Sequence, residues 1–461
     1  MKIGLLPLYI KLYDDACPFM RPRVEAFCDN VARGLAGYGL EVAAAPICRV
    51  KPEFDEAVKS FEAQGAAAIV TLHLAYSPSL ESIDALAGTR LPLIVLDVTE
   101  AYAFDPSVDA DEIMYNHGIH GVQDMCNMLI RRGKRFDIFT GHFEHSDALV
   151  RAAARCLGVQ IAGAFRGARI GLVGEPFDGM GDFQVPFGEL KRDFGVEVVE
   201  FDLESAAERA AAVTADEIAA ERRADEAAFD WDPSVTGELY DKTARVCLSV
   251  RKWAEEQNLS GLSVNFLATG SGRSGLPTMP FTECSKAMAR GMGYAGEGDV
   301  LTAALCGAVM SVYSDTTFTE MFCPDWKGGS VFLSHMGEFN YNIAAGRPRL
   351  TEKDFPYTKA FNPTVAYGTY KPGRAVYINL APRGAGKYAL IAAAGEVLPV
   401  CGENRMADSV NGWFKPDAPL PQFLERFSRA GGTHHSVLCY ADCMDAIAGF
   451  ASEMDFKLVI I

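Results

Sequence analysis

Residues 67–98 read AAIVTLHLAYSPSLESIDALAGTRLPLIVLDV, and they decide the fold class. Two short, continuous apolar runs, 67–74 and 92–98, flank a helical stretch, SLESIDALAG. A strand that is apolar at every position is buried on both faces, as in a parallel sheet covered by helices. KIGLLPLYI (2–10) and FDIFTGHF (136–143) extend the pattern, so we predict an α/β domain over residues 1–165.

The same alternation restarts after this domain. The strand-like runs are ARIGLVGEP (168–176), VEVVEFDL (196–203) and LSGLSVNFLA (259–268). The stretch from Ser205 to Asp230 is rich in Ala, Glu and Arg, and it is typical of one long, exposed helix. We therefore predict a second Rossmann-like α/β domain with a parallel sheet over residues 166–327.

From residue 328 onward the pattern changes to strands separated by Gly and Pro turns. GSVFLSHM (329–336), AVYINLAP (375–382) and KYALIAAAGEVLPV (387–400) have little helix between them. This spacing indicates a mainly antiparallel, barrel-like β domain over residues 328–461.

Composition and charge narrow the class of protein. The formal net charge of −17 argues against a nucleic-acid or membrane partner and suits a protein that handles small molecules. No apolar run approaches the roughly 18 residues needed to span a bilayer. The N-terminus, MKIGLLPLYIKLYDD, is typical of a first strand rather than of a signal peptide. None of the twelve cysteines is part of a CxxC motif. We therefore expect reduced thiols and a cytoplasmic protein.

One glycine-rich motif matches a dinucleotide fingerprint poorly. Gly270, Gly272 and Gly275 in TGSGRSG fit G-x-G-x-x-G after a strand. A dinucleotide site needs a helix to begin at once, but LPTMPF follows and its two prolines oppose a helix. An NAD-dependent oxidoreductase is therefore only an alternative.

A second glycine-rich stretch, GYAGEGDVLTAAL (293–305), carries two carboxylates. Asp299 precedes an apolar helical stretch, which makes it a good N-cap. Glu297 has no capping role, and Gly296 and Gly298 allow the backbone to bend closely around a ligand. A lone loop Glu is usually only solvated, so Glu297 indicates a site only if it has partners.

Such partners occur later in the chain. Glu320 lies in SDTTFTEMF, His335 in the strand-like VFLSHMGEF, and His434 and His435 in GGTHHSVLCY. Two Glu and two His would suit manganese, magnesium or cobalt better than copper or structural zinc. For His335 alone, a satisfied core histidine is the simpler interpretation.

Cys439 and Cys443 allow a competing Cys/His zinc site beside the histidine pair. Their C-x₃-C spacing, without a second cysteine pair, makes this alternative weak.

Taken in order, GYAGEGDVLTAAL, TTFTEMF, HM and GGTHHSV resemble the bacterial L-arabinose isomerase family, a branch of the arabinose/fucose isomerase group. HLAYSPS (73–79), NHGIHGVQD (116–124) and MGD (180–182) resemble further family segments. The resemblance covers most of the chain. It is strongest over about 290–335 and 431–437.

The resemblance implies the roles of particular residues. Metal ligands would be Glu297, Glu320, His335 and His435, with manganese as the expected ion and cobalt or magnesium as alternatives. Glu297 and Glu320 would also form the catalytic carboxylate pair, and His120 would enter the active site of a neighbouring subunit. The residues expected at the substrate are His73, His117, Met180 and His434.

The resemblance also implies an activity and an assembly. The activity would be a metal-dependent aldose–ketose isomerisation, in which an enediolate step moves hydrogen between C1 and C2 of a free sugar without an organic cofactor. Three domains would assemble into hexamers built from trimers. A non-catalytic sugar-binding protein and an epimerase of a sugar derivative are the alternatives.

Several positions depart from the family pattern. Met321 and Phe322 stand where Asp and Tyr are usual, and residues 337–340, GEFN, replace a Leu-Glu-Val-Cys-Pro-like run. His117 stands where Gln is usual, and the first strand lacks a Gln-His-Leu-Tyr-like loop. Changed polar groups around a sugar alter which hydroxyls are recognised. We therefore expect a substrate other than L-arabinose, such as another pentose, a hexose, a deoxysugar or a modified sugar.

Overall fold

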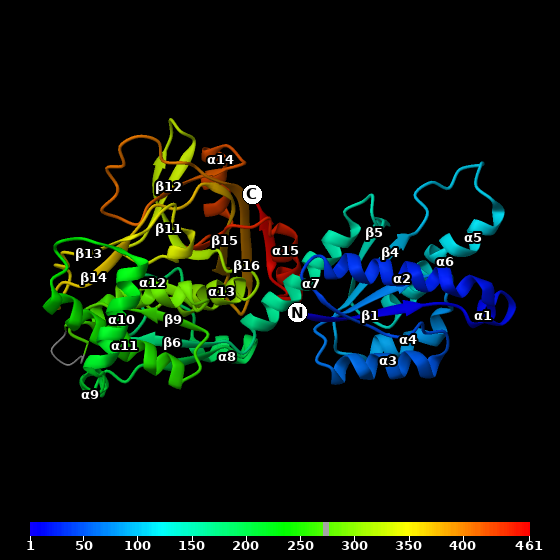
Figure 1. Ribbon diagram of the computed structural model, residues 1–461, viewed down its shortest axis with the longest axis horizontal. Helices are drawn as coiled ribbons and strands as arrows, with labels where there is room; N and C mark the ends of the chain where they lie inside the picture. The colour runs from blue at the N-terminus through cyan, green and yellow to red at the C-terminus, as the bar shows by residue number, and fades with distance from the viewer. Residues whose placement is uncertain (271–275) are drawn as a thin grey trace. The chain divides into compact units, whose positions relative to one another are not determined.

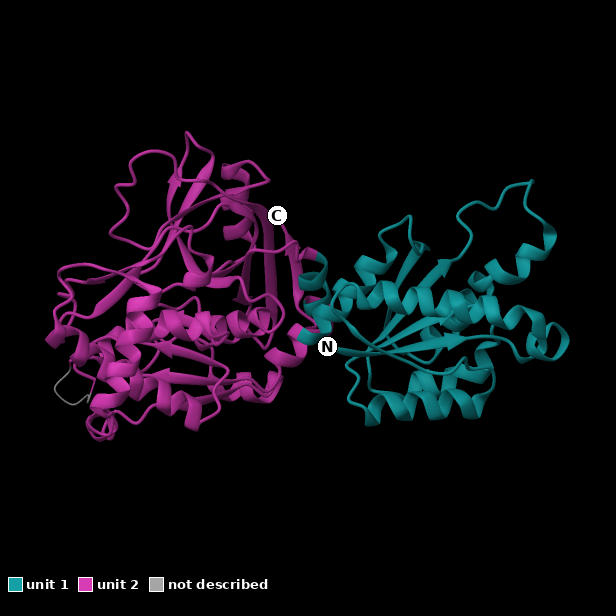
Figure 2. Cartoon of the chain, viewed as in Figure 1, with its two compact units in different colours: residues 1–160, 445–450 teal, residues 161–444, 451–461 magenta. Residues whose placement is uncertain are grey.

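The computed structural model describes residues 1–270 and 276–461 (Figure 1). The chain divides into two compact units (Figure 2): unit 1 comprises residues 1–160 and 445–450, and unit 2 comprises residues 161–444 and 451–461. The domain boundaries expected at residues 165/166 and 327/328 stay predictions. Gly272 and Gly275 of the TGSGRSG motif lie outside the described residues.

Unit 1 contains a five-stranded, all-parallel sheet in the order β2-β1-β3-β4-β5. The strands are β1 (Lys2–Leu8), β2 (Glu41–Ala44), β3 (Ile69–His73), β4 (Leu93–Thr99) and β5 (Phe136–His142). The predicted parallel sheet is confirmed, although the sequence pattern missed β2. The strand order reverses direction between β1 and β3, where ligands of such sheets usually bind beyond the carboxyl ends of the strands.

Helices cover both faces of this sheet (Figure 1). Ile94 and Leu96 of β4 pack in one core with α2 (Arg21–Ala36) and α7 (Ala148–Phe165). Leu93 and Val95 pack on the other face, in a core that includes residues of three helices, α3 (Lys51–Ala63), α4 (Ser79–Gly88) and α6 (Gly118–Arg131). Burial on both faces explains why the strand sequences are continuously apolar.

Helix α7 is the one helix, among the described residues, that is long and apolar enough to cross a membrane by length and composition. Arg151 and Arg155 interrupt it, which is why the sequence pattern contains no uninterrupted run of that length. Of this helix, 61% is buried inside the fold, and a buried core helix meets the same criteria.

Unit 2 begins with a four-stranded parallel sheet in the order β10-β9-β6-β7, which confirms the second parallel-sheet region. The strands are β6 (Arg169–Val173), β7 (Glu197–Glu200), β9 (Gly261–Val264) and β10 (Gly293–Gly296). The accompanying helices include α8 (Phe187–Phe194), α11 (Gly237–Glu256), α12 (Phe281–Ala289) and α13 (Val300–Met310).

The single helix predicted over 205–230 is wrong, because the structure has α9 (Ala206–Ala211) and α10 (Ala215–Ala228). Thr214 caps α10 and forms a reciprocal capping box with Glu217. A capping box satisfies two backbone donors that a continuous helix would not need to expose. Val213, which lies in the break, is buried.

The C-terminal part of unit 2 contains a seven-stranded sheet in the order β15-β18-β11-β12-β17-β16-β19. Strand β15 also pairs with β16, so the pairings close into a ring, and all of them except β16–β19 are antiparallel. The mainly antiparallel, ring-like region is as expected. Its strands are β11 (Thr316–Asp325), β12 (Ser330–Ser334), β15 (Gly373–Pro382), β16 (Tyr388–Val397), β17 (Gly412–Pro416), β18 (His435–Cys439) and β19 (Lys457–Ile460).

A small sheet, β14-β13-β8, and two helices complete the described part of unit 2. Their bounds are β8 (Asp230–Trp231), β13 (Arg349–Glu352), β14 (Thr364–Tyr367), α14 (Leu420–Arg429) and α15 (Met444–Met454), the last of which also contributes to unit 1. Strand β11 begins before residue 328, so Glu320 lies on the seven-stranded sheet rather than on the parallel one.

Candidate metal centre

Four side chains of unit 2 converge at the junction of its two main sheets. Glu297 follows β10, Glu320 lies in β11, His434 precedes β18 and His435 begins it. Each offers one ligand atom, and these atoms all lie within 4.8 Å of one another. In the antiparallel ladder of β11 and β18, Glu320 is paired with His435. The register of this ladder therefore positions two of the four donors.

The backbone at Glu297 is shaped for close approach. Glu297 has φ of +62°, a left-handed conformation that non-glycine residues rarely adopt and that often marks a functional site. A Cβ atom on Gly296 would lie 2.7 Å from Cε1 of His335, and one on Gly298 would lie 2.5 Å from Cα of Pro176. Only glycine fits on either side of this carboxylate.

Each of the three neighbouring histidines has its Nδ1 atom bonded to its own carboxylate. The pairs are His335 with Glu338 at 2.6 Å, His434 with Asp182 at 2.7 Å and His435 with Asp299 at 3.0 Å. Asp299 is also the predicted N-cap of α13, because it accepts a hydrogen bond from the Thr302 backbone N–H at 2.8 Å. Carboxylates in this arrangement fix the orientation of metal-binding imidazoles.

The Nε2 atoms of these rings point toward the two glutamates. Nε2 of His435 lies 3.0 Å from Oε1 of Glu320 and 3.5 Å from Oε2 of Glu297. Nε2 of His434 lies 3.7 and 3.9 Å from the same two atoms. His335 is outside the group of four, but its Nε2 is 3.9 Å from Oε1 of Glu320.

The converging carboxylates of this group need positive charge beside them. Burial alone would raise the pKa of Glu297 and of Glu320, but the histidines outweigh it and hold both pKa values below their usual range. Nε2 of His435 is buried and, although it lies 3.0 Å from Oε1 of Glu320, it makes no hydrogen bond of good geometry among the described residues. A neutral His435 that donates from Nδ1 would turn the Nε2 lone pair toward two carboxylates, which is repulsive unless a proton or a metal ion lies between them. The donor set therefore fits a hard or borderline divalent ion.

Aromatic rings shield one side of the group. Phe183 stacks on His435 at a centroid distance of 5.0 Å, and Phe318 meets His335 and His435 edge-on at 4.7 and 5.0 Å. Excluding water in this way strengthens the interactions between charges inside the site.

Sequence comparison identifies the family to which the chain belongs. A family model described as the L-arabinose isomerase central domain matches residues 188–315, and one described as the C-terminal domain matches residues 315–457. The chain belongs to the L-arabinose isomerase family. Membership places it among the sugar isomerases, which are enzymes.

Relatives within the L-arabinose isomerase family are distant but extensive. The chain is 27% identical to the L-arabinose isomerase of Nocardioides sp. over 84% of this chain and 78% of that one. It is 24% identical to that of Halalkalibacterium halodurans, over 86% and 80% of the two chains. The crystal structure of a periplasmic solute binding protein from Actinobacillus succinogenes with bound D-allose is 12% identical and covers 68% of this chain and 91% of that one. Its TM-score is only 0.17, so this similarity says nothing about the fold or function of this chain.

Three histidines that the family resemblance assigned to the active site lie in unit 1. His73 ends β3, His117 precedes α6, and His120 lies in the first turn of α6. The His117 and His120 rings meet edge-on at 5.8 Å, and Nε2 of His117 lies 3.0 Å from the hydroxyl of Tyr13. All of them are therefore at the carboxyl edge of the parallel sheet, near the β1/β3 reversal.

His73 is buried beneath α6. Neither of its ring nitrogens has a hydrogen-bond partner among the described residues, and a Cβ atom on Gly118 would lie 2.8 Å from the His73 carbonyl oxygen. Burial lowers the pKa of His73 to about 3, so its ring is neutral at ordinary pH.

We expect His73 to weaken the fold on acidification. The unfolded chain protonates this ring below pH 6.5 or so, whereas the folded chain resists until about pH 3. The contribution of the neutral His73 ring to the free energy of unfolding is thus complete above pH 6.5. It falls by about 1.4 kcal/mol per pH unit as the pH drops from 6.5 to about 3. Urea unfolding of wild type and His73→Leu from pH 7 to 4 should show a steeper decline for wild type. Parallel declines of wild type and His73→Leu would contradict this expectation.

Met180 lies in the loop after β6, two residues before Asp182, and its backbone N–H bonds to the Phe177 carbonyl at 3.3 Å. Asp182 and Glu338 were not predicted as site residues. The MGD segment and the carboxylate three positions after His335 were the available signals. The group of four includes neither Cys439 nor Cys443, so it gives no support to a Cys/His zinc site.

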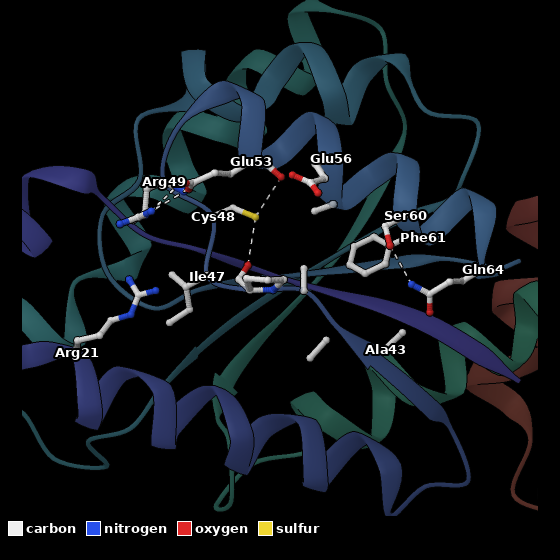
Figure 3. Close-up of a pocket in the computed structure, with 14 residues that line it drawn as sticks. Arg21, Ala43, Ile47, Cys48, Arg49, Glu53, Glu56, Ser60, Phe61 and Gln64 are labelled. Carbon is white, nitrogen blue, oxygen red and sulfur yellow. Dashed lines mark hydrogen bonds and ion pairs between the residues drawn. The ribbon is translucent and has the colours of Figure 1, made fainter.

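Another hollow, of about 470 Å³, lies in unit 1 beside β2 and α3 (Figure 3). Its Arg49 is bonded to Glu53 and Asp14, and the thiol of Cys48 donates to the carbonyls of Pro46 and Glu53 at 3.3 and 3.6 Å. Burial raises the pKa of Cys48 to about 12, which leaves the thiol unreactive. This hollow offers no chemistry comparable with the group in unit 2.

Proposed function

We propose that this protein is a divalent-metal-dependent aldose–ketose isomerase that acts on a free sugar. The observation that carries the proposal is the convergence of two glutamates and two histidines, with each imidazole held by a further carboxylate. Relatives named L-arabinose isomerase, which match at least 84% of this chain in the two comparisons above, support the reaction class.

Glu297, Glu320 and His435 would hold the ion, together with His335 or His434. Manganese is the first candidate, and cobalt and magnesium are the alternatives. A divalent ion at this site would supply Lewis-acid stabilisation of the negative charge that develops on the sugar oxygens. No organic cofactor is required.

The glutamates would move the proton. In an aldose, the hydrogen on C2 is weakly acidic because it lies beside the C1 carbonyl. One glutamate, acting as a carboxylate, removes this proton and leaves an enediolate. Delivery of a proton to C1, with transfer of the hydroxyl proton from O2 to O1 as the C2 carbonyl forms, then gives the ketose. Both glutamates are ionised at the start, so the one that has taken the C2 proton is the acid able to return it, and the second would carry the O2 proton to O1.

Substrate contacts would come from unit 2 of one copy and from unit 1 of a neighbouring copy. His434 is partly exposed at the edge of the group. Met180 lies in the same loop as Asp182, the carboxylate that is bonded to His434. We propose that His120, with His117 beside it, reaches the active site of a neighbouring copy in a homo-oligomer, expected to be a hexamer.

Exposed apolar side chains in unit 1 support this assembly. They lie in the loops and helix starts that follow β1, β3 and β4, and their exposed fractions are 50–74%: Leu12, Phe19, Leu80, Tyr102, Phe104 and Ile113. Because all six follow the carboxyl ends of strands in one sheet, burial of that edge against a neighbouring copy would remove them from water.

The test is turnover in deuterated water with Mn²⁺-loaded protein. L-arabinose, D-galactose, L-fucose and D-ribose would be offered, and the product analysed for ketose and for deuterium at C1. Ketose carrying solvent deuterium supports an isomerase that works by proton transfer. Saturable sugar binding without turnover would favour a sugar-binding protein, and inversion at one carbon without ketose would favour an epimerase.

A further inference from the structure

A small recess beside Glu297 has a mostly apolar wall. Its volume is about 10 Å³, roughly the space of one water molecule. The wall is formed mainly by Val264, Phe266, Met279, Phe281, Met336 and Phe355. Glu297 belongs both to this wall and to the proposed metal group, and His335 also lines the recess, so the recess adjoins the reaction site.

The other polar side chains of the wall are already engaged. Oε2 of Glu338 pairs with Nδ1 of His335 at 2.6 Å, and Oε1 of Glu338 accepts a hydrogen bond from the Tyr294 hydroxyl at 2.7 Å. The Glu297 carboxylate is turned toward His434 and His435. A hydroxyl group placed in the recess would have to share carboxylate oxygens that already hold His335 and Tyr294, and a poorly paired buried hydroxyl is unfavourable.

Aromatic packing fixes the shape of this wall. Phe355 meets Phe281 edge-on at 5.6 Å and Phe266 at 6.1 Å, and Phe266 also contacts Phe177 at 5.7 Å. Close-packed rings cannot easily rearrange to offer a polar partner. The recess therefore suits an apolar group no larger than a methyl.

We propose that this recess receives the terminal methyl group of the substrate, which is therefore a deoxysugar carrying CH₃ where an ordinary hexose carries CH₂OH. The inference rests on the proposed isomerase function and narrows its substrate class. The C6 methyl of a hexose is only a few bonds from C2, so a recess that shares Glu297 with the reaction site is within its reach.

The experiment compares sugars that differ only beyond C5. L-Arabinose, D-fucose and D-galactose share one configuration from C2 to C4 and carry H, CH₃ and CH₂OH on C5. D-Arabinose, L-fucose and L-galactose form a second series, and L-lyxose, L-rhamnose and L-mannose a third. In any series that the Mn²⁺-loaded protein converts, we expect kcat/KM for the CH₃ sugar to exceed that for the CH₂OH sugar by about 10- to 100-fold.

Two variants locate the preference in the recess. Val264→Thr and Met279→Gln keep side-chain volume but add a polar group there, and each should bring the CH₃/CH₂OH ratio toward one. Val173→Thr is the matched control, because Val173 pairs with Val264 in the neighbouring strand and does not line the recess. A preference that persists in both variants would overturn the proposal.

The outcomes separate this inference from the proposed function. Turnover with equal or better use of the CH₂OH sugars overturns the recess assignment and leaves the isomerase intact. If no sugar is converted, calorimetric binding of the matched alditols to Mn²⁺-loaded protein decides the question. Tighter binding of the CH₃ alditol then supports the recess although isomerisation fails, and equal or absent binding overturns it.

Discussion

Glu297→Gln is expected to lower kcat for sugar isomerisation by about 10³-fold or more, with the fold retained. Glutamine keeps the size of the side chain but cannot accept a proton, and proton transfer by a positioned side chain contributes about 10²–10⁴-fold. The change also removes an anionic ligand from the group that Glu297 forms with Glu320, His434 and His435. Ketose formation at saturating sugar and Mn²⁺ would measure the effect.

The control for this variant is Glu255→Gln, which makes the same chemical change on the exposed face of α11. It should retain wild-type activity. If Glu297→Gln kept more than a tenth of wild-type kcat with bound metal, Glu297 would have no part in proton transfer.

Removal of the divalent ion is expected to abolish turnover and to lower the thermal midpoint of unfolding. Without an ion, the converging carboxylates of Glu297 and Glu320 depend on protonated histidines for compensation. An ion present at 100 times its Kd stabilises the folded state by about 2.7 kcal/mol. Chelation followed by titration with Mn²⁺, monitored by activity and by thermal melting, checks both effects.

His435→Gln should lose the Mn²⁺-dependent shift in midpoint, because it removes the most buried donor of the group. His145→Gln, an exposed substitution in unit 1, should keep the shift. Full activity after complete chelation, together with an unchanged midpoint, would show that the group is not a metal site.

Strands were predictable where both faces are buried, and less so elsewhere. The apolar runs of β3 and β4 were legible because each residue enters one of two cores. Strand β10 is only GYAG, and its place depends on a long-range contact: a Cβ atom on Gly293 would lie 2.7 Å from Cα of Gly307 in α13. Strand β2 was missed because this edge strand is only partly buried. Such tertiary determinants leave no periodic signal in the sequence.

The candidate metal ligands could be predicted from the sequence, but the carboxylates that hold the histidines in place could not. Residue type and order, with the family resemblance, indicated Glu297, Glu320 and the histidine pair. The ladder register of β11 and β18, rather than spacing, sets His435 opposite Glu320. Asp182 could not have been paired with His434 from sequence, because the contact joins segments far apart in the chain. The apolar recess likewise depends on packing among several separate elements.

The ladder between β11 and β18 has a consequence for biosynthesis. Glu320 leaves the ribosome long before His435, and the strands between them in the sequence must be made before β18 can pair with β11. A nascent chain therefore holds its acidic donors without the histidine that faces them. The proposed metal-binding group can be completed only once nearly the whole polypeptide has been synthesised, so an ion bound there would be acquired by the finished protein rather than during translation.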